Sequence, residues 1–442
     1  MITRLLNLYE RLRSSLWVVP ALLTVGAFIL SQLTMLADAW IQQAGIQVPL
    51  LFPGGLQGAR HVLGALVASM VSLTTISFSM MMVVLTLASS QFGPRVLRNF
   101  LSDRVNQVAL GVFVATFVYC LGVLSRVPES DGSSMDTPRL AVTLAVALTL
   151  LSLGTLISFI HHIARSIQAS QVVMRAHGEL QRSIRTVYPD LDDETKPADP
   201  PAVAPERPDG PAREVRAERP GYLQAIATDE VLKFARTHDA WVQLHLKPGQ
   251  FVNSGDRVAE VWARSEPPPT EALAKSARDW LVLGPERTGE QDVQFGFRQI
   301  TEIATRALSP GINDPATAVS CIDYIGEALA DLAARRQPPT VSCDEDGRPR
   351  CQRPQDQFTD IAAVVFDNLR VYGRGHPEVM RRLVAVLAHL APRLQEPGEN
   401  QWALTALESL ATEAKHLGAT TDRERYEAKC ADTREVLEAA AG

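Results

Sequence analysis

The feature that most constrains this chain is the run from Val62 to Phe92, which contains no charged residue. A helix of this length is about 46 Å long, because each residue adds about 1.5 Å, whereas the hydrocarbon core of a bilayer is about 30 Å thick. The run therefore predicts a helix that crosses a membrane and either protrudes beyond it or tilts strongly. Gly93 and Pro94 follow directly and predict its end.

Three further apolar runs predict a total of four membrane spans. The first run is about 20 residues long, which exceeds the apolar region of a typical signal peptide, so we expect a retained span despite the small residues Ala37 and Ala39 at its end. Trp17 and Trp40 flank it, as interfacial aromatic residues do. The predicted spans are about 17–37, 61–92, 107–127 and 139–160, and a cytosolic helical extension continues to residue 188.

Arginine residues determine the predicted orientation. They gather in the N-terminal segment, in the loop after the second span and in the region after the fourth, while the other two loops are nearly neutral or acidic. The positive-inside rule then places both termini in the cytoplasm. The excess of Arg over Lys and the heavy use of Ala are typical of bacterial proteins from high-GC genomes. We therefore expect a multi-pass protein of a bacterial inner (plasma) membrane.

The polar part of the chain follows a Pro-rich stretch, 189–220, whose composition favours a linker. Residues 221–264 alternate as strands do and resemble a barrel-sandwich domain, although the exposed turn lacks the lysine that carrier domains modify. Residues 265–442 have helical periodicity. The expected fold class is therefore mainly α: a four-helix transmembrane module over 1–188, the linker, a small β domain and an α-helical cytosolic bundle.

Composition and motifs argue against several classes of function. The net charge of -6 gives no support for a nucleic-acid partner. The five cysteines form no paired metal-ligand spacing, so we expect no metal and no other cofactor. We find no P-loop, dinucleotide fingerprint, nucleophile elbow or kinase motif set. An enzyme is therefore the least expected class.

Hydroxyl side chains recur along the second predicted span at spacings of three, four or seven, so they share one side of the helix. They are Ser69, Ser72, Thr75, Ser79, Thr86 and Ser89. Such a stripe is typical of helix–helix contacts in membranes, and it can also line a polar path when several copies surround an axis. Because the span contains no charged residue, a passive pore is favoured over an ion-coupled transporter.

Three arginines, Arg95, Arg98 and Arg104, follow the same span. Their plain interpretation is topology determination and contact with lipid headgroups. In a ring-shaped oligomer the same residues would form a positive cytoplasmic mouth that favours anions.

The densest polar constellation of the cytosolic part runs from Arg287 to Asp323. Its candidate ligand-binding or partner-binding residues are Arg287, Gln291, Asp292, Arg298, Arg306, Ser309, Asn313 and Asp314. The plain interpretation of the corner that ends at Asp314 is capping and turn geometry, because Asp314 can cap the following helix and Pro315 occupies its first position. The functional interpretation is a site at the helix junction.

Two stretches carry a family resemblance: SSQFGPRVLRNFLSDRVNQVALGVFVATFVYCLGVL and RTGEQDVQFGFRQITEIATRALSPGINDPATA. They resemble the signatures of a bacterial family of predicted multispan membrane proteins, domain-of-unknown-function family 2254. The resemblance spans nearly the whole chain and implies an inner-membrane protein with a cytosolic C-terminal region, without implying an activity. The matching positions are Ser90, Gln91, Phe92, Pro94, Arg95, Arg98 and Asn99, and then Arg287, Gln291, Asp292, Arg306, Ser309, Asn313, Asp314 and Pro315.

Two functional hypotheses follow. The first is a homo-oligomeric, channel-like pore in the lipid bilayer. In this hypothesis the second span lines the pore, and the cytosolic part gates the pore or acts as its sensor. The alternative is a membrane-anchored scaffold or sensor that binds an unidentified ligand or protein partner through its cytosolic domain without conducting.

Overall fold

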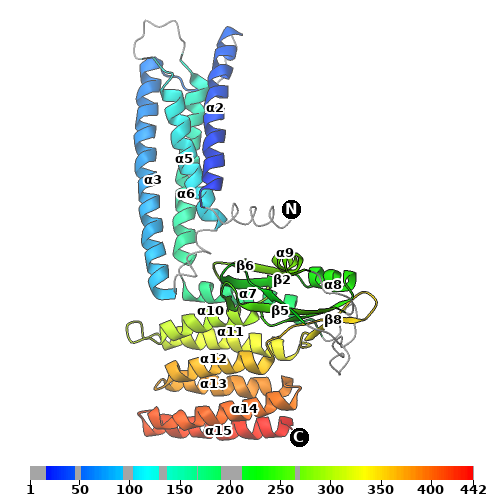
Figure 1. The fold of residues 1–442 in the computed structure, drawn as a ribbon. Coiled ribbons are helices and arrows are strands. Elements are labelled where there is room, and N and C mark those ends of the chain that lie inside the picture. Colours follow the sequence, from blue (N-terminus) through cyan, green and yellow to red (C-terminus); the bar gives the residue numbers. More distant parts are fainter. Residues whose placement is uncertain are drawn as a thin grey trace. The chain divides into compact units, whose positions relative to one another are not determined.

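The structure, a computed structural model, describes residues 16–44, 51–92, 103–128, 137–166, 168–190, 212–263 and 269–441 (Figure 1). The chain divides into two compact units, Met1–Val172 and Val173–Gly442, called here the first and the second unit. The protein is mainly helical, as the sequence predicted.

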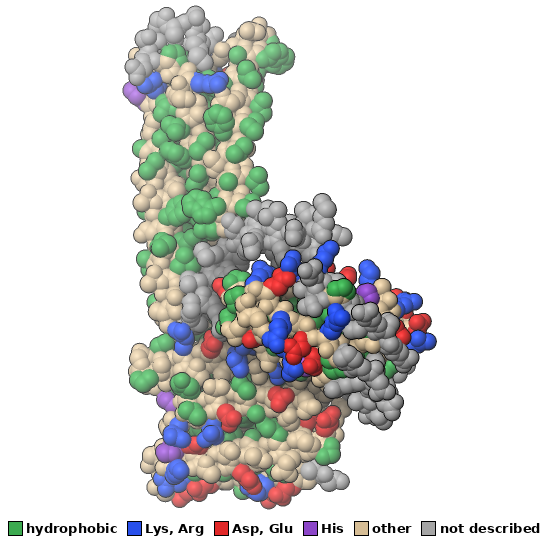
Figure 2. Space-filling model, in the orientation of Figure 1, with side chains coloured by type: hydrophobic (Ala, Val, Ile, Leu, Met, Phe, Trp, Pro, Cys, Tyr) green, Lys and Arg blue, Asp and Glu red, His purple; other side chains and the backbone are tan. Residues whose placement is uncertain are grey.

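In its described part, the first unit contains four long helices. They are α2 (Val18–Gln43), α3 (Leu56–Phe92), α5 (Arg104–Leu124) and α6 (Arg139–Ser166). Each is long and apolar enough to cross a membrane, as predicted. Helix α5 packs against the other three and is the most buried of the four. Apolar side chains cover much of this unit on the face shown in Figure 2.

Two glycines of α5 allow α2 to approach closely. A Cβ atom on Gly111 would lie 2.6 Å from the Leu23 side chain and 3.1 Å from the Pro20 Cα, and one on Gly122 would lie 2.7 Å from the Ser31 Oγ. Small residues of this kind bring helix backbones together in a membrane, where no hydrophobic force drives helices against each other. The sequence therefore specifies the close α2–α5 contact by placing glycine, which has no side chain, at these two positions.

The helical extension after the fourth span is described as two elements: α6 ends at Ser166, and α7 (Ala169–Val187) follows. Most of α7 belongs to the second unit, where its Leu180 lies against Gly296 of α10 (Val293–Ala307). An amphipathic helix gains most of its stability from packing its apolar face, and this packing explains why α7 is a separate element.

The second unit begins with a mixed region of strands and two helices, α8 (Thr228–Thr237) and α9 (Thr270–Trp280). The strands are β1 (Arg213–Arg216), β2 (Gly221–Ile226), β3 (Ala240–Leu244), β4 (Phe251–Val252), β5 (Arg257–Ala263), β6 (Leu281–Gly284), β7 (Val341–Cys343) and β8 (Pro349–Gln352). Within the described residues they form a five-stranded sheet of order β1-β5-β3-β8-β7 and a three-stranded sheet of order β4-β2-β6. Their buried side chains share one apolar core with those of α8 and α9, which includes Trp280 and Val242.

The sheets draw on more of the chain than we expected. Strand β1 lies inside the stretch 189–220 that we expected to be a linker, because it pairs with β5. Strands β7 and β8 form a hairpin, and β8 also pairs in parallel with β3. Strands β1 and β8 thus join the five-stranded sheet through pairing with distant segments, which local sequence patterns do not reveal.

The remaining helices are stacked in two rows (Figure 1). One row consists of α10, α12 (Phe358–Gly373) and α14 (Pro397–Ala411), and the other of α11 (Pro315–Ala333), α13 (Pro377–Leu390) and α15 (Thr420–Ala441). Two short 3-10 helices, Ala391–Arg393 and Thr412–His416, follow α13 and α14. Aromatic side chains bridge one row: the rings of Phe358 and Phe366 each meet the ring of Trp402 edge-on.

Candidate functional site

The predicted hydroxyl stripe lies on the outward face of α3. The side chains of Ser69, Ser72, Thr75, Ser79 and Thr86 are exposed and that of Ser89 is half-buried. The opposite face of α3 is packed inside the unit through Leu63, Met70, Leu73, Met81, Val84 and Ala88. The stripe therefore takes no part in the packing of α3 against α5 and α6 within one protomer.

The outward faces of the neighbouring helices have a different character. On α2 the exposed large side chains include Leu22, Phe28 and Leu36, and on α6 they include Leu150 and Ile157. Large aliphatic and aromatic side chains suit contact with lipid tails. Helix α3 also exposes apolar residues, but among them it places the row of hydroxyl groups.

Several of these hydroxyls are hydrogen-bonded within their own helix. Ser72 donates to the Ala68 carbonyl oxygen at 3.2 Å, and Thr75 donates to that of Val71 at 2.9 Å. Thr86 donates to the Met82 carbonyl oxygen at 2.9 Å. Each oxygen keeps lone pairs that can accept a further hydrogen bond from water or from a facing helix.

The first unit contains a buried carboxylate, Asp38, that was not predicted from the sequence. Asp38 lies within α2, which continues to Gln43, beyond the predicted end of the first span. Its two oxygens accept hydrogen bonds from the main-chain N–H groups of Leu140 (2.9 Å) and Ala141 (2.8 Å) at the start of α6. Asp38 is thus an N-cap for α6 supplied by another helix. The available signal was an acidic residue at the end of an apolar run, beside Trp40.

Neutral hydrogen bonds connect the same helices further along. The Tyr119 hydroxyl of α5 pairs with the Thr34 hydroxyl of α2 at 3.0 Å and donates to the Ala141 carbonyl oxygen of α6 at 3.1 Å. Thr116 of α5 pairs with Ser152 of α6 at 3.0 Å, and both are buried. These bonds satisfy polar atoms that would otherwise be costly to bury.

The predicted arginine mouth is described only in part. Arg95 and Arg98 lie outside the described residues, and Arg104 is exposed at the first position of α5. The preceding Asp103 caps α5 by accepting from the Val105 N–H at 2.9 Å. Its second oxygen is 2.9 Å from Nε2 of His162 on α6, an interaction that the sequence did not reveal.

In the second unit, the candidate residues divide between the two ends of α10. Arg287, Gln291 and Asp292 lie at its N-terminal end, whereas Arg306, Ser309, Asn313 and Asp314 lie at its C-terminal corner. The helix separates the two groups by roughly 22 Å. Arg298 lies between them on α10, and its Nε is buried without a described hydrogen-bond partner. The constellation is therefore two local structures rather than one site.

A buried ion pair organises the N-terminal group. Arg287 donates from Nε and Nη2 to one oxygen of Asp292, at 2.9 and 2.6 Å, and the side chain of Asp292 is 1% exposed. Its other oxygen caps α10 at the Phe295 N–H. Burial raises the pKa of Asp292 above its ordinary value, and the Arg287 charge opposes this shift. Both side chains therefore stabilise the start of α10.

Neighbouring segments close over this ion pair. Gly249 has a φ of +91°, and a Cβ there would lie 2.0 Å from Asp292 Oδ2, so glycine is required both for the turn and for the space. Gln291 accepts from the Ile226 N–H at 2.9 Å and donates to the Ile226 carbonyl oxygen at 3.2 Å. The Gln291 side chain thus forms two hydrogen bonds with the main chain of β2, and these bonds connect the start of α10 to the three-stranded sheet.

The corner at the other end of α10 is held by its own hydrogen bonds. Ser309 donates to the Arg306 carbonyl oxygen at 2.6 Å, and Asn313 adopts a positive φ of 50°. Asp314 caps α11 as predicted, accepting from the N–H of Thr317 at 3.1 Å and from its hydroxyl at 2.6 Å. These bonds from Thr317 lower the pKa of Asp314 below its ordinary value. Ile312, within the corner, is exposed.

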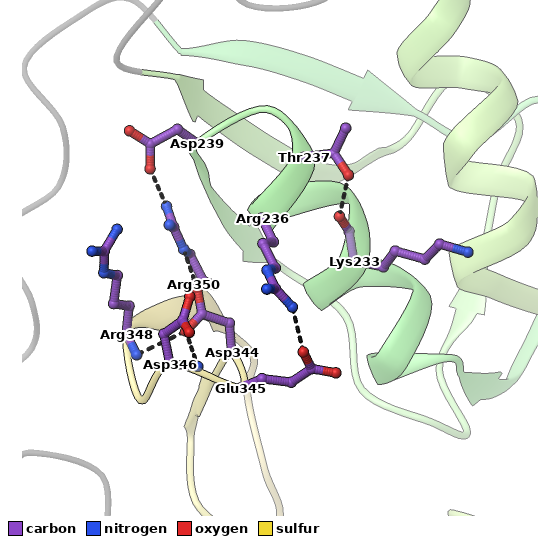
Figure 3. Close-up of polar contacts among 9 residues, drawn as sticks. All are labelled: Lys233, Arg236, Thr237, Asp239, Asp344, Glu345, Asp346, Arg348 and Arg350. Atoms are coloured by element: carbon purple, nitrogen blue, oxygen red, sulfur yellow. Dashed lines mark hydrogen bonds and ion pairs between the residues drawn. The ribbon is translucent and has the colours of Figure 1, made fainter.

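Two further charge clusters were not anticipated. Figure 3 shows the first, where Arg350 of β8 binds Asp239 at 2.5 Å and Asp344 at 2.9 Å and so fastens the β7–β8 hairpin to the turn after α8. In the same view Arg236 of α8 pairs with Glu345. Burial would raise the pKa of Asp344, but hydrogen bonds, among them those from Arg350, lower it overall.

The second cluster joins neighbouring layers of the helical stack. Glu413, whose side chain is 3% exposed, binds Arg370 at 2.6 Å and Arg374 at 2.9 Å. Burial would raise its pKa, but the hydrogen bonds from Arg374 and Arg370 lower it overall. The partners are about forty residues apart in sequence, which is why no local pattern revealed them.

Comparison with known proteins agrees with the membrane character of the chain. Residues 13–389 match a family described as predicted membrane protein (DUF2254). The chain belongs to this family. Uncharacterised proteins from Mycobacterium tuberculosis and Mycobacterium bovis are each 30% identical to it over 442 residues, which cover 99% of this chain and 84% of each relative. No solved structure matches the chain.

Proposed function

We propose that this family member is a homo-oligomeric, channel-like protein of the bacterial inner membrane. In this proposal α3 lines the path, and the second unit lies in the cytoplasm, where it gates or senses. The observation that carries the proposal is the outward position of the hydroxyl stripe. Five of its six hydroxyl side chains are exposed on the protomer, in a row along the outward face of α3.

Oligomerisation would place the hydroxyl face of α3 in contact with water instead of lipid tails. Copies arranged around an axis with α3 inward would turn the lipid-compatible faces of α2 and α6 outward and collect the hydroxyls around water. Because α3 carries no charge between Val62 and Phe92, the path would conduct passively. Arg104, together with Arg95 and Arg98, would favour anions at the cytoplasmic mouth.

The second unit suits a sensing role in this proposal. Its two sheets are compatible with the barrel-sandwich-like module that the sequence resembles, and Lys247 of that segment forms an ion pair with Asp356. The unit would bind a ligand or partner and transmit that event to the membrane helices. No enzymatic step is part of the proposal.

The test is electrical recording of the purified full-length protein in a planar bilayer under chloride and potassium gradients. We expect discrete conductance with an anion-selective reversal potential. Ser79→Leu should block it, because a leucine replaces an exposed hydroxyl of the path with a bulky apolar group. Ser158→Leu, at an exposed serine on α6, is the matched control and should conduct normally. Unchanged conductance in Ser79→Leu would remove this residue from the path.

The competing function is a membrane-anchored scaffold or sensor without conduction. It is favoured by the exposed apolar side chains of the second unit, which include Ile312, Val371 and Tyr372, because such residues often mark interaction surfaces. Silence of the wild-type protein across voltage and pH, combined with selective ligand or partner binding by the second unit, would favour this alternative.

A further inference from the structure

The exposed face of α7 carries a row of basic side chains. Between His161 and Tyr188 the residues with a full charge at neutral pH are Arg165, Arg175, Arg182, Arg185 and Glu179. Arg175, Arg182 and Arg185 are separated by seven and three residues, so they share one side of the helix, and all three are exposed. Met174, beside them, is 46% exposed. This set of four side chains is called the basic face of α7.

The opposite face of α7 is fixed to the second unit. Val173 and Ile184 are fully buried, and Leu180 lies against Gly296. Gln181 donates to Glu327 of α11 at 2.8 Å, and His177 also binds this carboxylate. The orientation of α7 on its unit is therefore set by packing, and the basic face points away from that packing.

Chain connectivity keeps the start of α7 near a membrane-spanning helix. Helix α6, a candidate span, ends at Ser166, and α7 begins at Ala169. The two intervening residues can extend over at most about 10 Å. The first turn of α7, with Met174 and Arg175 in the turn that follows, is thus tethered within a short distance of the end of a membrane-spanning helix.

We propose that the basic face of α7 binds the headgroups of anionic lipids at the cytoplasmic membrane surface. Arginine guanidinium groups form charge-assisted hydrogen bonds with phosphate oxygens, and basic residues next to a span are attracted by the negative potential of an anionic leaflet. Met174 adds an apolar contact of the kind that interfacial helices use. This lipid contact holds the second unit at the bilayer whether or not the protein conducts.

The test uses the full-length protein in nanodiscs with an environment-sensitive fluorophore at position 174, introduced by Met174→Cys. Cys343→Ser removes the cysteine that is not buried, since the other four are buried. In discs that contain phosphatidylglycerol we expect blue-shifted emission relative to discs of phosphatidylcholine alone, and high salt should reverse the shift. Equal emission in the two lipids would overturn the proposal.

Substitution of the arginines identifies the contact. Arg182→Gln with Arg185→Gln should lower the ratio of bound to free α7 by roughly fivefold per arginine, which is the effect of one basic residue near an anionic surface. Arg425→Gln with Lys429→Gln on α15 removes the same charge and should leave the shift intact. A shift that survives the first pair, or disappears with the second, would contradict the assignment to α7. A shift produced in phosphatidylcholine discs by inorganic phosphate would show that lipid is not the ligand.

Discussion

The two units stabilise buried polar groups in different ways. In the described part of the first unit, the buried carboxylate of Asp38 accepts from main-chain N–H groups, and the buried hydroxyls of Thr116 and Ser152 pair with each other. In the second unit, the buried carboxylate of Glu399 also accepts from main-chain N–H groups, but those of Glu413 and Asp292 bind arginines. The difference shows that the long apolar helices are joined by hydrogen bonds that need no opposite charge, whereas the second unit adds full ion pairs.

The largest expected effect comes from breaking an ion pair in the second unit. Glu413→Gln removes the negative charge that two arginines share, and loss of one partner of a buried pair costs about 3 kcal/mol. Hydrogen exchange of the full-length protein, read on peptides from α12 and α14, should show a corresponding loss of protection. Glu408→Gln is the control, because this residue is 62% exposed and lies 3.6 Å from Arg434. Equal protection in the two variants would contradict the importance of the pair.

A smaller effect is expected at the carboxylate of the first unit. Asp38→Ala leaves the Leu140 and Ala141 N–H groups without their acceptor, and the loss of such a cap costs about 2 kcal/mol. Exchange should become faster at the start of α6. Asp38→Asn keeps one carbonyl oxygen and should retain part of the protection. If the asparagine variant lost as much as the alanine variant, the charge rather than the cap would be the stabilising feature, and the contrast between the units would fail.

The smallest effect is expected for a neutral pair between helices. Thr116→Val preserves the shape of the side chain but removes its hydrogen bond with Ser152, and such bonds in membranes contribute about 0.6 kcal/mol. Exchange near Ser152 should therefore change only slightly. Thr155→Val is the control, because the Thr155 hydroxyl bonds only within its own helix in the described structure. An effect as large as that of Glu413→Gln would contradict the expectation that ion pairs of the second unit stabilise more than neutral hydrogen bonds of the first unit.

Much of the fold could be predicted because its signals are local. The uncharged run from Val62 to Phe92 is sufficient to predict α3, and Asp314 with Pro315 marks the start of α11. The hydroxyl stripe was found by spacing alone. Its outward position could not be predicted, because spacing shows which residues share a face but not what that face contacts.

The features that we did not predict depend on contacts between distant parts of the chain. Strand β8 joins β3 across about 110 residues, and Glu413 meets Arg374 across 39. Asp38 was overlooked because hydropathy defines a span by its apolar residues, and the cap became visible only when α6 was seen beside α2.

The stacked helices of the second unit have a consequence for how local opening would spread through it. In a stack of layers, each layer is stabilised chiefly by its neighbours, so the terminal layer can open without disturbing those beneath it. Glu413, which lies between α14 and α15 in the sequence and binds the end of α12, fastens the terminal layer to the layer beneath it.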